Sequence, residues 1–352
     1  MMLAAAFLIA LAAGLSLTPI GIRLAWATGY LDHPEARKLH TSATPLLGGF
    51  IVFVCATLAW ALVSLHALHR PGPELRAVIS GAIVAVAIGM WDDRFGMWPL
   101  AKLLGQAGAA MLLVGGTRMA HIGLPAPGDW LFTVVSVVAL MNATNFLDNM
   151  NGMVGGITAI AMAAFAWDSA YRGELGLAAG QLAVSGACVG FLRYNYPRGR
   201  LFLGDAGSLF LGYSLAASGL LAYHGAAGRW ARPGAIIMLG YPVFDMVFVV
   251  VTRLREGRHV YEGGKDHTNH RLASVLGCQK RTVKLIWLVG AALSASGLVV
   301  LNLNRPLPTL LSLALWMSLF LVVGVRLSRV PVSRPEPSNP GLNAAASPTS
   351  RT

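Results

Sequence analysis

The chain has 352 residues, of which 55% are hydrophobic and 12% are charged, and its formal net charge is +12. Soluble domains carry about 25% charged residues, so this composition excludes an ordinary soluble globule. The positive charge requires no nucleic-acid partner, because Lys and Arg in the loops of a membrane protein follow from its topology and from anionic lipid headgroups.

Apolar segments follow one another along the chain, most of them near the length of about 20 residues that a helix needs to cross a bilayer. In chain order they are 3–22, 47–67, 76–91, 99–116, 130–145, 153–170, 175–192, 206–225, 233–252, 284–302 and 307–326. The sequence therefore predicts an all-α polytopic membrane protein with 10–11 transmembrane helices, forming one integral-membrane domain over 1–328. The Pro- and Ser-rich segment 329–352 is predicted to be a disordered tail.

The loops after the odd-numbered segments carry most of the Lys and Arg residues, with a dense cluster at 253–284. Cytoplasmic loops of membrane proteins are enriched in these residues. This asymmetry predicts that the odd loops and the C-terminus are cytoplasmic and that the N-terminus is outside.

Five polar stretches interrupt the apolar pattern, and all five fall on the odd loops. They are "LDHPEARKLHTSATPLLGG" (31–49), "WDDRFG" (91–96), "NATNFLDNMNG" (142–152), "RYNYPRGRLFLGDAGS" (193–208) and "RLREGRHVYEGGKDHTNHRL" (253–272). A transporter more often distributes ionisable residues along a path through the bilayer. Clustering on one side favours an active site that faces the cytosol.

Acidic residues in these stretches suggest phosphate or metal chemistry. Asp92 and Asp93 end an apolar segment, and neighbouring carboxylates repel each other unless a cation lies between them; the alternative is a loop cap. Asp205 follows a glycine at a predicted helix start, where backbone N–H groups can bind phosphate, although it could itself be the N-cap. Asp148 lies at the membrane surface, where an ionised group is costly without a function.

Amides surround Asp148 at helical spacing. Asn142, Asn145 and Asp148 recur every third residue, so a continued helix would place them on one face, as a packing seam or as the wall of a polar site. Mg²⁺ takes about one or two carboxylates from a protein and fills its shell with water and phosphate. Asp205 with Asn145, or with an Asp from 92–93, would suffice.

Basic residues in the same loops could neutralise a diphosphate: Lys102, Arg193, Arg200, Arg258, Lys265, His267, His270 and Arg271. His267 and His270 make a thin case for zinc, because no third Cys or His accompanies them, so phosphate contact or a structural loop is favoured. Asp245 lies inside an apolar segment, where structural pairing is favoured over a place in the site.

Together these motifs resemble the polyprenyl-phosphate N-acetylhexosamine-1-phosphate transferase family over roughly residues 30–300. The matching stretches are "DHPEARKLHTSATPLLGG", "DDRFGMWPLAKLLGQ", "NATNFLDNMNG", "FLGDAGS" and "DHTNHRL". Three positions depart from the family pattern: Asn151 replaces an Asp, Asn269 replaces a His, and Gly96 replaces an acid found in some relatives.

The resemblance implies that a polyprenyl (undecaprenyl) phosphate attacks a UDP-N-acetylhexosamine, most simply UDP-N-acetylglucosamine, and that UMP is released. It implies a bacterial inner-membrane enzyme acting in the first membrane step of a cell-envelope polysaccharide such as lipopolysaccharide, with Mg²⁺ or Mn²⁺ as cofactor; a homodimer stays open. Asp92, Asp93 and Asp148 would be catalytic, and Asp205 and Asn145 would hold the metal. Substrate-binding residues would be Lys102, Asn142, Asn151, Arg200, Arg258, His267, His270, Arg271 and His40.

Two other functions are alternatives to this one. A secondary transporter would form no covalent product and would show matching inverted halves. An Asp-rich membrane prenyltransferase would share the metal and the prenyl lipid, but it would need paired N-D-x-x-D motifs, which "DDRFG" and "NFLDN" fit poorly.

Overall fold

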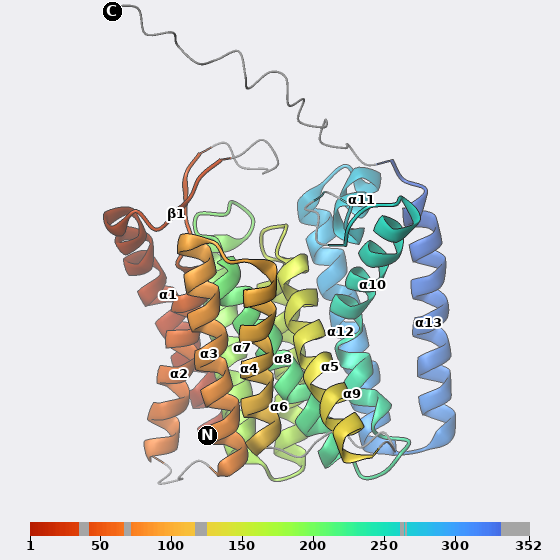
Figure 1. Cartoon of the computed structure of the whole chain (residues 1–352). Helices are drawn as coiled ribbons and strands as arrows, with labels where there is room; N and C mark the ends of the chain where they lie inside the picture. Colours follow the sequence, from red (N-terminus) through yellow and green to blue (C-terminus); the bar gives the residue numbers. More distant parts are fainter. Residues whose placement is uncertain (35–41, 67–71, 117–124, 261–263, 265, 332–352) are drawn as a thin grey trace, which may run out of the picture.

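The structure is a computed structural model that describes residues 1–34, 42–66, 72–116, 125–260, 264 and 266–331 (Figure 1). These residues form helices and one short antiparallel hairpin, in which Leu31 pairs with Pro45. The elements are α1 (Met2–Thr28), β1 (Leu31–Asp32), β2 (Thr44–Pro45), α2 (Gly48–His66), α3 (Pro73–Phe95), α4 (Pro99–Gly116), α5 (Ala126–Leu147), α6 (Met153–Tyr171), α7 (Leu175–Asn195), α8 (Gly204–Gly225), α9 (Pro233–Met238), α10 (Gly240–Arg255), α11 (Thr268–Leu276), α12 (Gln279–Leu303) and α13 (Pro306–Ser328).

Ten of the described helices are long and apolar enough to cross a membrane, namely α1 to α8, α12 and α13. The prediction of an all-α polytopic membrane protein is therefore confirmed. The remaining predicted segment, 233–252, is not one helix, because it breaks at Leu239 into α9 and α10. Pro242 has no N–H to donate to the carbonyl of Met238, so the regular hydrogen-bond ladder ends there.

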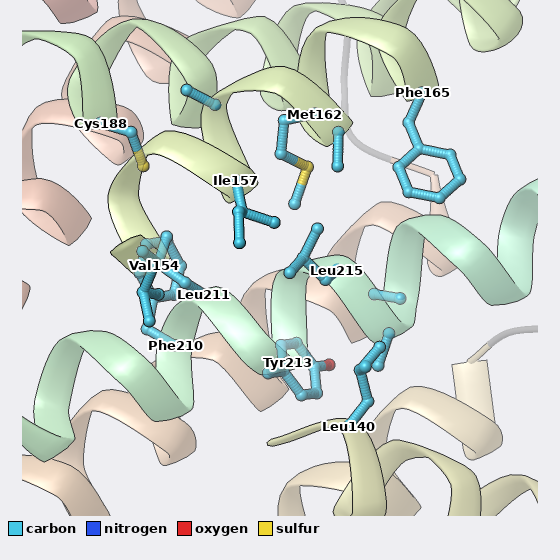
Figure 2. Packing of buried hydrophobic residues seen from close by; sticks show 14 of the residues in the cluster. Leu140, Val154, Ile157, Met162, Phe165, Cys188, Phe210, Leu211, Tyr213 and Leu215 are labelled. Carbon is cyan, nitrogen blue, oxygen red and sulfur yellow. The ribbon is translucent and has the colours of Figure 1, made fainter. Parts of the chain in front are cut away.

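Helix α8 lies at the centre of the bundle, and 89% of its most apolar stretch is buried, against 11% for the peripheral α13 (Figure 1). Figure 2 shows Leu211 and Leu215 of α8 packed among apolar side chains such as Ile157 and Met162 of α6. A helix that is apolar all round is a buried one. This rigid centre carries the start of α8, where one of the polar stretches lies.

Small residues bring α2 and α3 into direct contact with the first turn of α8. A Cβ on Gly49 would lie 2.0 Å from the backbone nitrogen of Gly207, and one on Gly89 would lie 2.3 Å from the Cα of Ala206. Backbone hydrogen bonds from Gly49 to Leu203 (2.8 Å) and from Phe202 to Pro45 (2.9 Å) extend the contact. The 42–49 stretch therefore fixes the position of the 201–208 stretch.

The described parts of all five polar stretches lie at one end of the bundle. In Figure 1 the β1–β2 hairpin and α11 lie at the end opposite the N-terminus, where α3, α5, α7 and α10 also end. The predicted convergence of these stretches on one face is confirmed. Residues 35–41 and 332–352, and with them His40 and most of the predicted tail, lie outside the described residues.

Candidate active site

An ammonium group between two carboxylates lies at this end of the bundle. Lys102 Nζ, in the first turn of α4, is 2.8 Å from Asp92 Oδ2 of α3 and 2.7 Å from Asp205 Oδ2 of α8. All three side chains are mostly enclosed, with Lys102 16% exposed and Asp205 29% exposed. A cation between two carboxylates relieves their repulsion. The predicted residues Asp92, Lys102 and Asp205 therefore meet in one cluster.

Asp93 has a different role from its neighbour, because it caps α8. Its Oδ1 accepts a hydrogen bond from the backbone N–H of Asp205 (2.8 Å), and its Oδ2 accepts one from Ala206 (3.0 Å). A Cβ on Gly204 would lie 2.6 Å from Asp93 Oδ2, and Gly204 has a φ of +70°, so glycine is needed at that position.

This cap changes one expectation from the sequence. The N–H groups at the start of α8 were expected to bind phosphate, but the groups of Asp205 and Ala206 are already taken by Asp93. A carboxylate at a helix start is stabilised by the unpaired N–H groups and the helix dipole. Asp93 therefore sets the position of Asp205, and its predicted catalytic role stays a prediction.

The amides of the 142–152 stretch join neighbouring helices to α5. Helix α5 ends at Leu147 instead of continuing, so the expected single face ends there. The side-chain amides of Asn142 and of the buried Gln106 of α4 donate hydrogen bonds to each other. The distance from Gln106 Nε2 to Asn142 Oδ1 is 3.4 Å. Asn145 donates to Asp205 Oδ1 (2.5 Å) and to Ser208 Oγ (2.8 Å).

In the loop after α5, amide side chains also form hydrogen bonds that join this stretch to neighbouring helices. Asn149 Oδ1 accepts a hydrogen bond from Asn269 (2.6 Å), which ties the loop to α11. The N–H of Gly152 donates to Asn195 Oδ1 of α7 (2.6 Å). Asn142 and Asn149 thus form a packing seam, and Asn145 is the amide of this stretch that contacts the carboxylate cluster.

The side-chain oxygens of Asp148 have no hydrogen-bond partner within the described ranges, unlike those of the other carboxylates at this site. Asp148 follows the last residue of α5 and is partly buried. Removal from water, with a smaller contribution from the negative charge of Asp205, raises the pKa of Asp148 to about 7. Asp148 can therefore gain or lose a proton near neutral pH.

The start of α11 is held in the same way as the start of α8. Asp245 of α10 has no exposed surface, and it accepts hydrogen bonds from His267 Nδ1 (2.8 Å) and from the backbone N–H of Thr268 (2.8 Å). The predicted structural pairing of Asp245 is confirmed, with α11 as its partner.

A buried ion pair joins the end of α10 to the loop just before the start of α11. Arg253 donates to both oxygens of Asp266, each at 2.8 Å. Burial alone would raise the pKa of Asp266, but the hydrogen bonds and charge of Arg253 outweigh it and hold the pKa well below its usual range. Nη1 of Arg258 joins this pair at 3.0 Å from Asp266, and the predicted contact of Arg258 with substrate stays a prediction.

Comparison with known proteins identifies the family. The profile described as glycosyl transferase family 4 matches residues 75–223. The chain is 31% identical over 302 residues, 75% of this chain and 74% of the relative, to the decaprenyl-phosphate N-acetylglucosaminephosphotransferase of Mycobacterium tuberculosis (strain ATCC 25618 / H37Rv). The chain belongs to the polyprenyl-phosphate N-acetylglucosamine-1-phosphate transferase family.

Two further relatives span most of both chains. A probable undecaprenyl-phosphate N-acetylglucosaminyl 1-phosphate transferase of Bacillus subtilis (strain 168) is 29% identical over 326 residues, 90% of this chain and 87% of that protein. An undecaprenyl-phosphate alpha-N-acetylglucosaminyl 1-phosphate transferase of Escherichia coli (strain K12) is 26% identical over 321 residues, 87% of this chain and 86% of that protein. These matches therefore extend over most of the chain.

Arg271 is the predicted substrate-binding residue that the structure places elsewhere. Its side chain is 2% exposed, and its Nη1 donates to the backbone carbonyls of Leu327 (3.2 Å), Ser328 (3.2 Å) and Val330 (2.7 Å). These are carbonyls at the end of α13, which have no partner inside their own helix. Arg271 is therefore a cap for α13, and its burial and these bonds do not support the predicted contact with substrate.

Arg200, His270 and Asn151, three other predicted substrate residues, belong to polar stretches at the same end of the bundle. Arg200 is exposed, and His270 is partly exposed with its ring 6.3 Å from that of His267. Asn151 lines a separate cavity of about 290 Å³ with Tyr196, Cys278 and others between the ends of α7 and α12. Their contacts with substrate stay predictions.

Sequence reasoning missed three residues that support the site. Ser208 is hydrogen-bonded to Asn145, and Gln106 is hydrogen-bonded to Asn142. The hydroxyl of Thr268 donates a second hydrogen bond to Asp245 Oδ1, beside the one from its backbone N–H. Ser208 is part of "GDAGS", so the motif contained a signal for it. Gln106 is a lone polar residue in an apolar helix, which is a signal of the same kind as Asp245.

Proposed function

We propose that this protein transfers N-acetylglucosamine-1-phosphate from UDP-N-acetylglucosamine to undecaprenyl phosphate. A phosphate oxygen of the lipid attacks the sugar-bearing β-phosphorus, and the bond from that phosphorus to the bridging oxygen breaks. The products are undecaprenyl-diphospho-N-acetylglucosamine and UMP. The observation that carries the proposal is the Asp92–Lys102–Asp205 cluster at one end of a membrane-spanning bundle, where a lipid phosphate and a water-soluble nucleotide sugar can meet.

Both reactants are anions, so the protein has to position them and neutralise charge. Lys102 already lies between two carboxylates, and its ammonium can exchange one of them for a phosphate oxygen when substrate arrives. The carboxylate that Lys102 keeps as its partner then holds the lysine side chain beside the reacting group. Asn145 and Asp93 keep Asp205 in place from two sides.

Mg²⁺ is the cofactor that we propose, with Mn²⁺ as a substitute. The donor set fits, because oxygens of Asp92 and Asp205 point at one place that accepts a positive charge, which Lys102 occupies. No group of three or more His, Cys, Asp or Glu side chains arranged for a metal occurs among the described residues. Mg²⁺ needs only one or two protein carboxylates when phosphate supplies the rest. Bound by Asp205 and Asp92, it would neutralise the diphosphate.

Asn145 was predicted as a second metal ligand. Its amide nitrogen faces Asp205 and Ser208, so in this arrangement it orients the carboxylate instead of offering its carbonyl oxygen. We propose that it supports Asp205 from this position.

Asp148 is the residue best placed to handle a proton. Its oxygens are uncommitted among the described residues, and its pKa of about 7 is close to the second pKa of a phosphate monoester, near 6. We propose that it accepts the proton of lipid phosphate that arrives singly ionised. The contribution is modest, because much of the lipid phosphate is already doubly ionised at neutral pH.

We propose that the cluster faces the cytoplasm of a bacterial inner membrane and that the reaction begins a cell-envelope polysaccharide. The basic loops at this end of the bundle support that orientation, and UDP-sugars are cytoplasmic, soluble donors. The C-terminus would then be cytoplasmic and the N-terminus outside. A homodimer stays a prediction.

The test is a reaction of the purified protein in detergent with undecaprenyl phosphate, Mg²⁺ and a panel of UDP-sugars. We expect equal amounts of UMP and lipid-linked sugar with UDP-N-acetylglucosamine, and none with an Asp205→Ala variant that keeps the wild-type melting curve. Uptake of sugar into proteoliposomes without UMP release would favour a transporter. Release of inorganic diphosphate from a prenyl diphosphate would favour a prenyltransferase.

A further inference from the structure

Asp245 is a buried carboxylate that the proposed chemistry leaves unexplained. It lies in the apolar run "GYPVFDMVFVV" of α10 and has no exposed surface. A carboxylate in such a place is costly unless it is fully hydrogen-bonded. Its Oδ1 accepts bonds from the N–H (2.8 Å) and Oγ1 (2.5 Å) of Thr268, and its Oδ2 accepts one from His267 Nδ1 (2.8 Å).

This contact fixes the chemistry of the His267 ring. An ionised carboxylate only accepts hydrogen bonds, so Nδ1 must carry a proton and Nε2 is left as the second functional nitrogen. Nε2 has no hydrogen-bond partner among the described residues, and it is not among their fully enclosed polar atoms. Asp245 therefore leaves one defined nitrogen, Nε2, available on a His267 side chain that is 7% exposed.

The His267 ring lies against the stretch that carries Asp148. The His267 ring meets the ring of Phe146 edge to face at 6.3 Å, and Asn269 donates to Asn149 at 2.6 Å. Phe146 and Asn149 flank Asp148 in sequence. The first turn of α11 is therefore fastened to the stretch that carries the titrating carboxylate.

We propose that Asp245 is a positioning residue that acts through His267, holding its ring so that Nε2 contacts an oxygen of the bound nucleotide sugar. The inference rests on the proposed function for the identity of the ligand. Its physical logic is that of any imidazole oriented by a carboxylate: the partner selects the tautomer and fixes the direction of the free nitrogen. Thr268, bonded to the same carboxylate, fixes the start of α11 relative to α10.

Two substitutions separate positioning from mere packing. In Asp245→Asn the carbonyl oxygen can still accept from Thr268, but the amide N–H₂ opposes the Nδ1–H of His267, which favours the other tautomer. In His267→Asn the amide nitrogen can still donate to Asp245, but the group corresponding to Nε2 is gone. We expect each variant to lower kcat/KM by about 10- to 100-fold, the value of a hydrogen bond to a charged group.

The double variant and a matched control complete the test. If Asp245 acts through His267, Asp245→Asn adds no further loss in the His267→Asn background. Asp168→Asn is the control, because Asp168 is also a buried carboxylate of a membrane helix, paired with Arg172 at 2.9 Å, but lies near the other end of the bundle. We expect that control to lower the melting temperature without changing kcat.

The proposal is overturned if Asp245→Asn keeps wild-type kcat/KM or if the two losses multiply in the double variant. It is also overturned if the loss of activity in each variant equals the fraction of protein that is unfolded. A readout without substrate is the ¹⁵N spectrum of histidine-labelled protein, where His267 should show the Nδ1–H form in wild type and the Nε2–H form in Asp245→Asn. An Nε2–H form in wild type would also overturn it. Failure of the proposed function shows separately, as wild-type protein that releases no UMP from any UDP-sugar, and the spectra then decide the positioning contact alone.

Discussion

Removing the carboxylate of Asp93 should destabilise the protein far more than removing the carboxylate of Asp92, although the two residues are adjacent. Asp93 accepts two backbone hydrogen bonds at the start of α8, at 2.8 and 3.0 Å, whereas Asp92 shares Lys102 with Asp205. A hydrogen bond to a charged group contributes about 1.5–3 kcal/mol. Two such bonds give about 3–6 kcal/mol.

Two effects reduce that figure for Asp93→Ala. The site is partly open, so water can satisfy some of the freed N–H groups, and the repulsion among three nearby carboxylates falls. We therefore expect a loss of about 2–4 kcal/mol in the free energy of unfolding. Asp92→Ala should cost about 0–1 kcal/mol, the value of a partly exposed ion pair whose lysine keeps its other partner. Asp93→Asn can accept only one of the two bonds, so it should lie between wild type and Asp93→Ala.

The assay is denaturant unfolding in mixed micelles, followed by UMP release per folded molecule. Stability should decrease in the order wild type, Asp92→Ala, Asp93→Asn, Asp93→Ala. The kcat of Asp92→Ala should nevertheless be much lower than that of wild type, although its stability is almost the same. Equal stability of the two alanine variants would refute the division of labour between the two acids. So would an Asp93→Asn variant as stable as wild type.

Five further outcomes are expected. Lys102→Met should lower kcat per folded molecule by roughly 10²- to 10³-fold, because the charge that faces the phosphates is lost. It should also lower the melting temperature, because Asp92 and Asp205 then repel each other with no cation between them; stopped UMP assays of folded protein check the first effect. If ionised Asp148 is needed, activity should rise with pH through about 7, and Asp148→Asn should remove that limb. Because the folded-state pKa of Asp148 is raised, its effect on stability is unfavourable above about pH 7 and absent below its unfolded pKa near 4, so Asp148→Asn should stabilise at pH 8 and not at pH 4. EDTA should abolish UMP release, and Mg²⁺ or Mn²⁺ should restore it. Arg271→Ala should lower the melting temperature while kcat per folded molecule stays within about twofold, because its bonds go to α13.

The membrane-spanning architecture could be predicted because apolar length alone decides it. The clustering of the polar stretches at one end could also be predicted from the sequence. Successive loops between membrane-crossing helices lie on alternate sides of the membrane, so all the odd loops lie on the same side. The break between α9 and α10 was missed, although Pro242 inside the segment is a recognised signal for one.

The division of labour among the polar residues could not be predicted, because it depends on which helices are neighbours. Successive residues on a helix point about 100° apart, so Asp92 reaches α4 while Asp93 reaches α8. The local sequence of "DDR" contains no information about either neighbour. Arg271 shows the same limit, since its partners at the end of α13 lie more than fifty residues further along the chain.

The two helix starts at the candidate site share one construction, and it explains why acids lie so deep in an apolar chain. Neither Leu203 before α8 nor His267 before α11 supplies a side-chain cap to its own helix. In each case a carboxylate from a neighbouring helix, Asp93 of α3 or Asp245 of α10, accepts hydrogen bonds from the backbone N–H groups at the helix start instead. A cap from a neighbouring helix fixes the distance between the two helices as well as the helix start. Loss of either acid should therefore displace Asp205 or His267 without removing it, so that kcat falls while both functional side chains are still present.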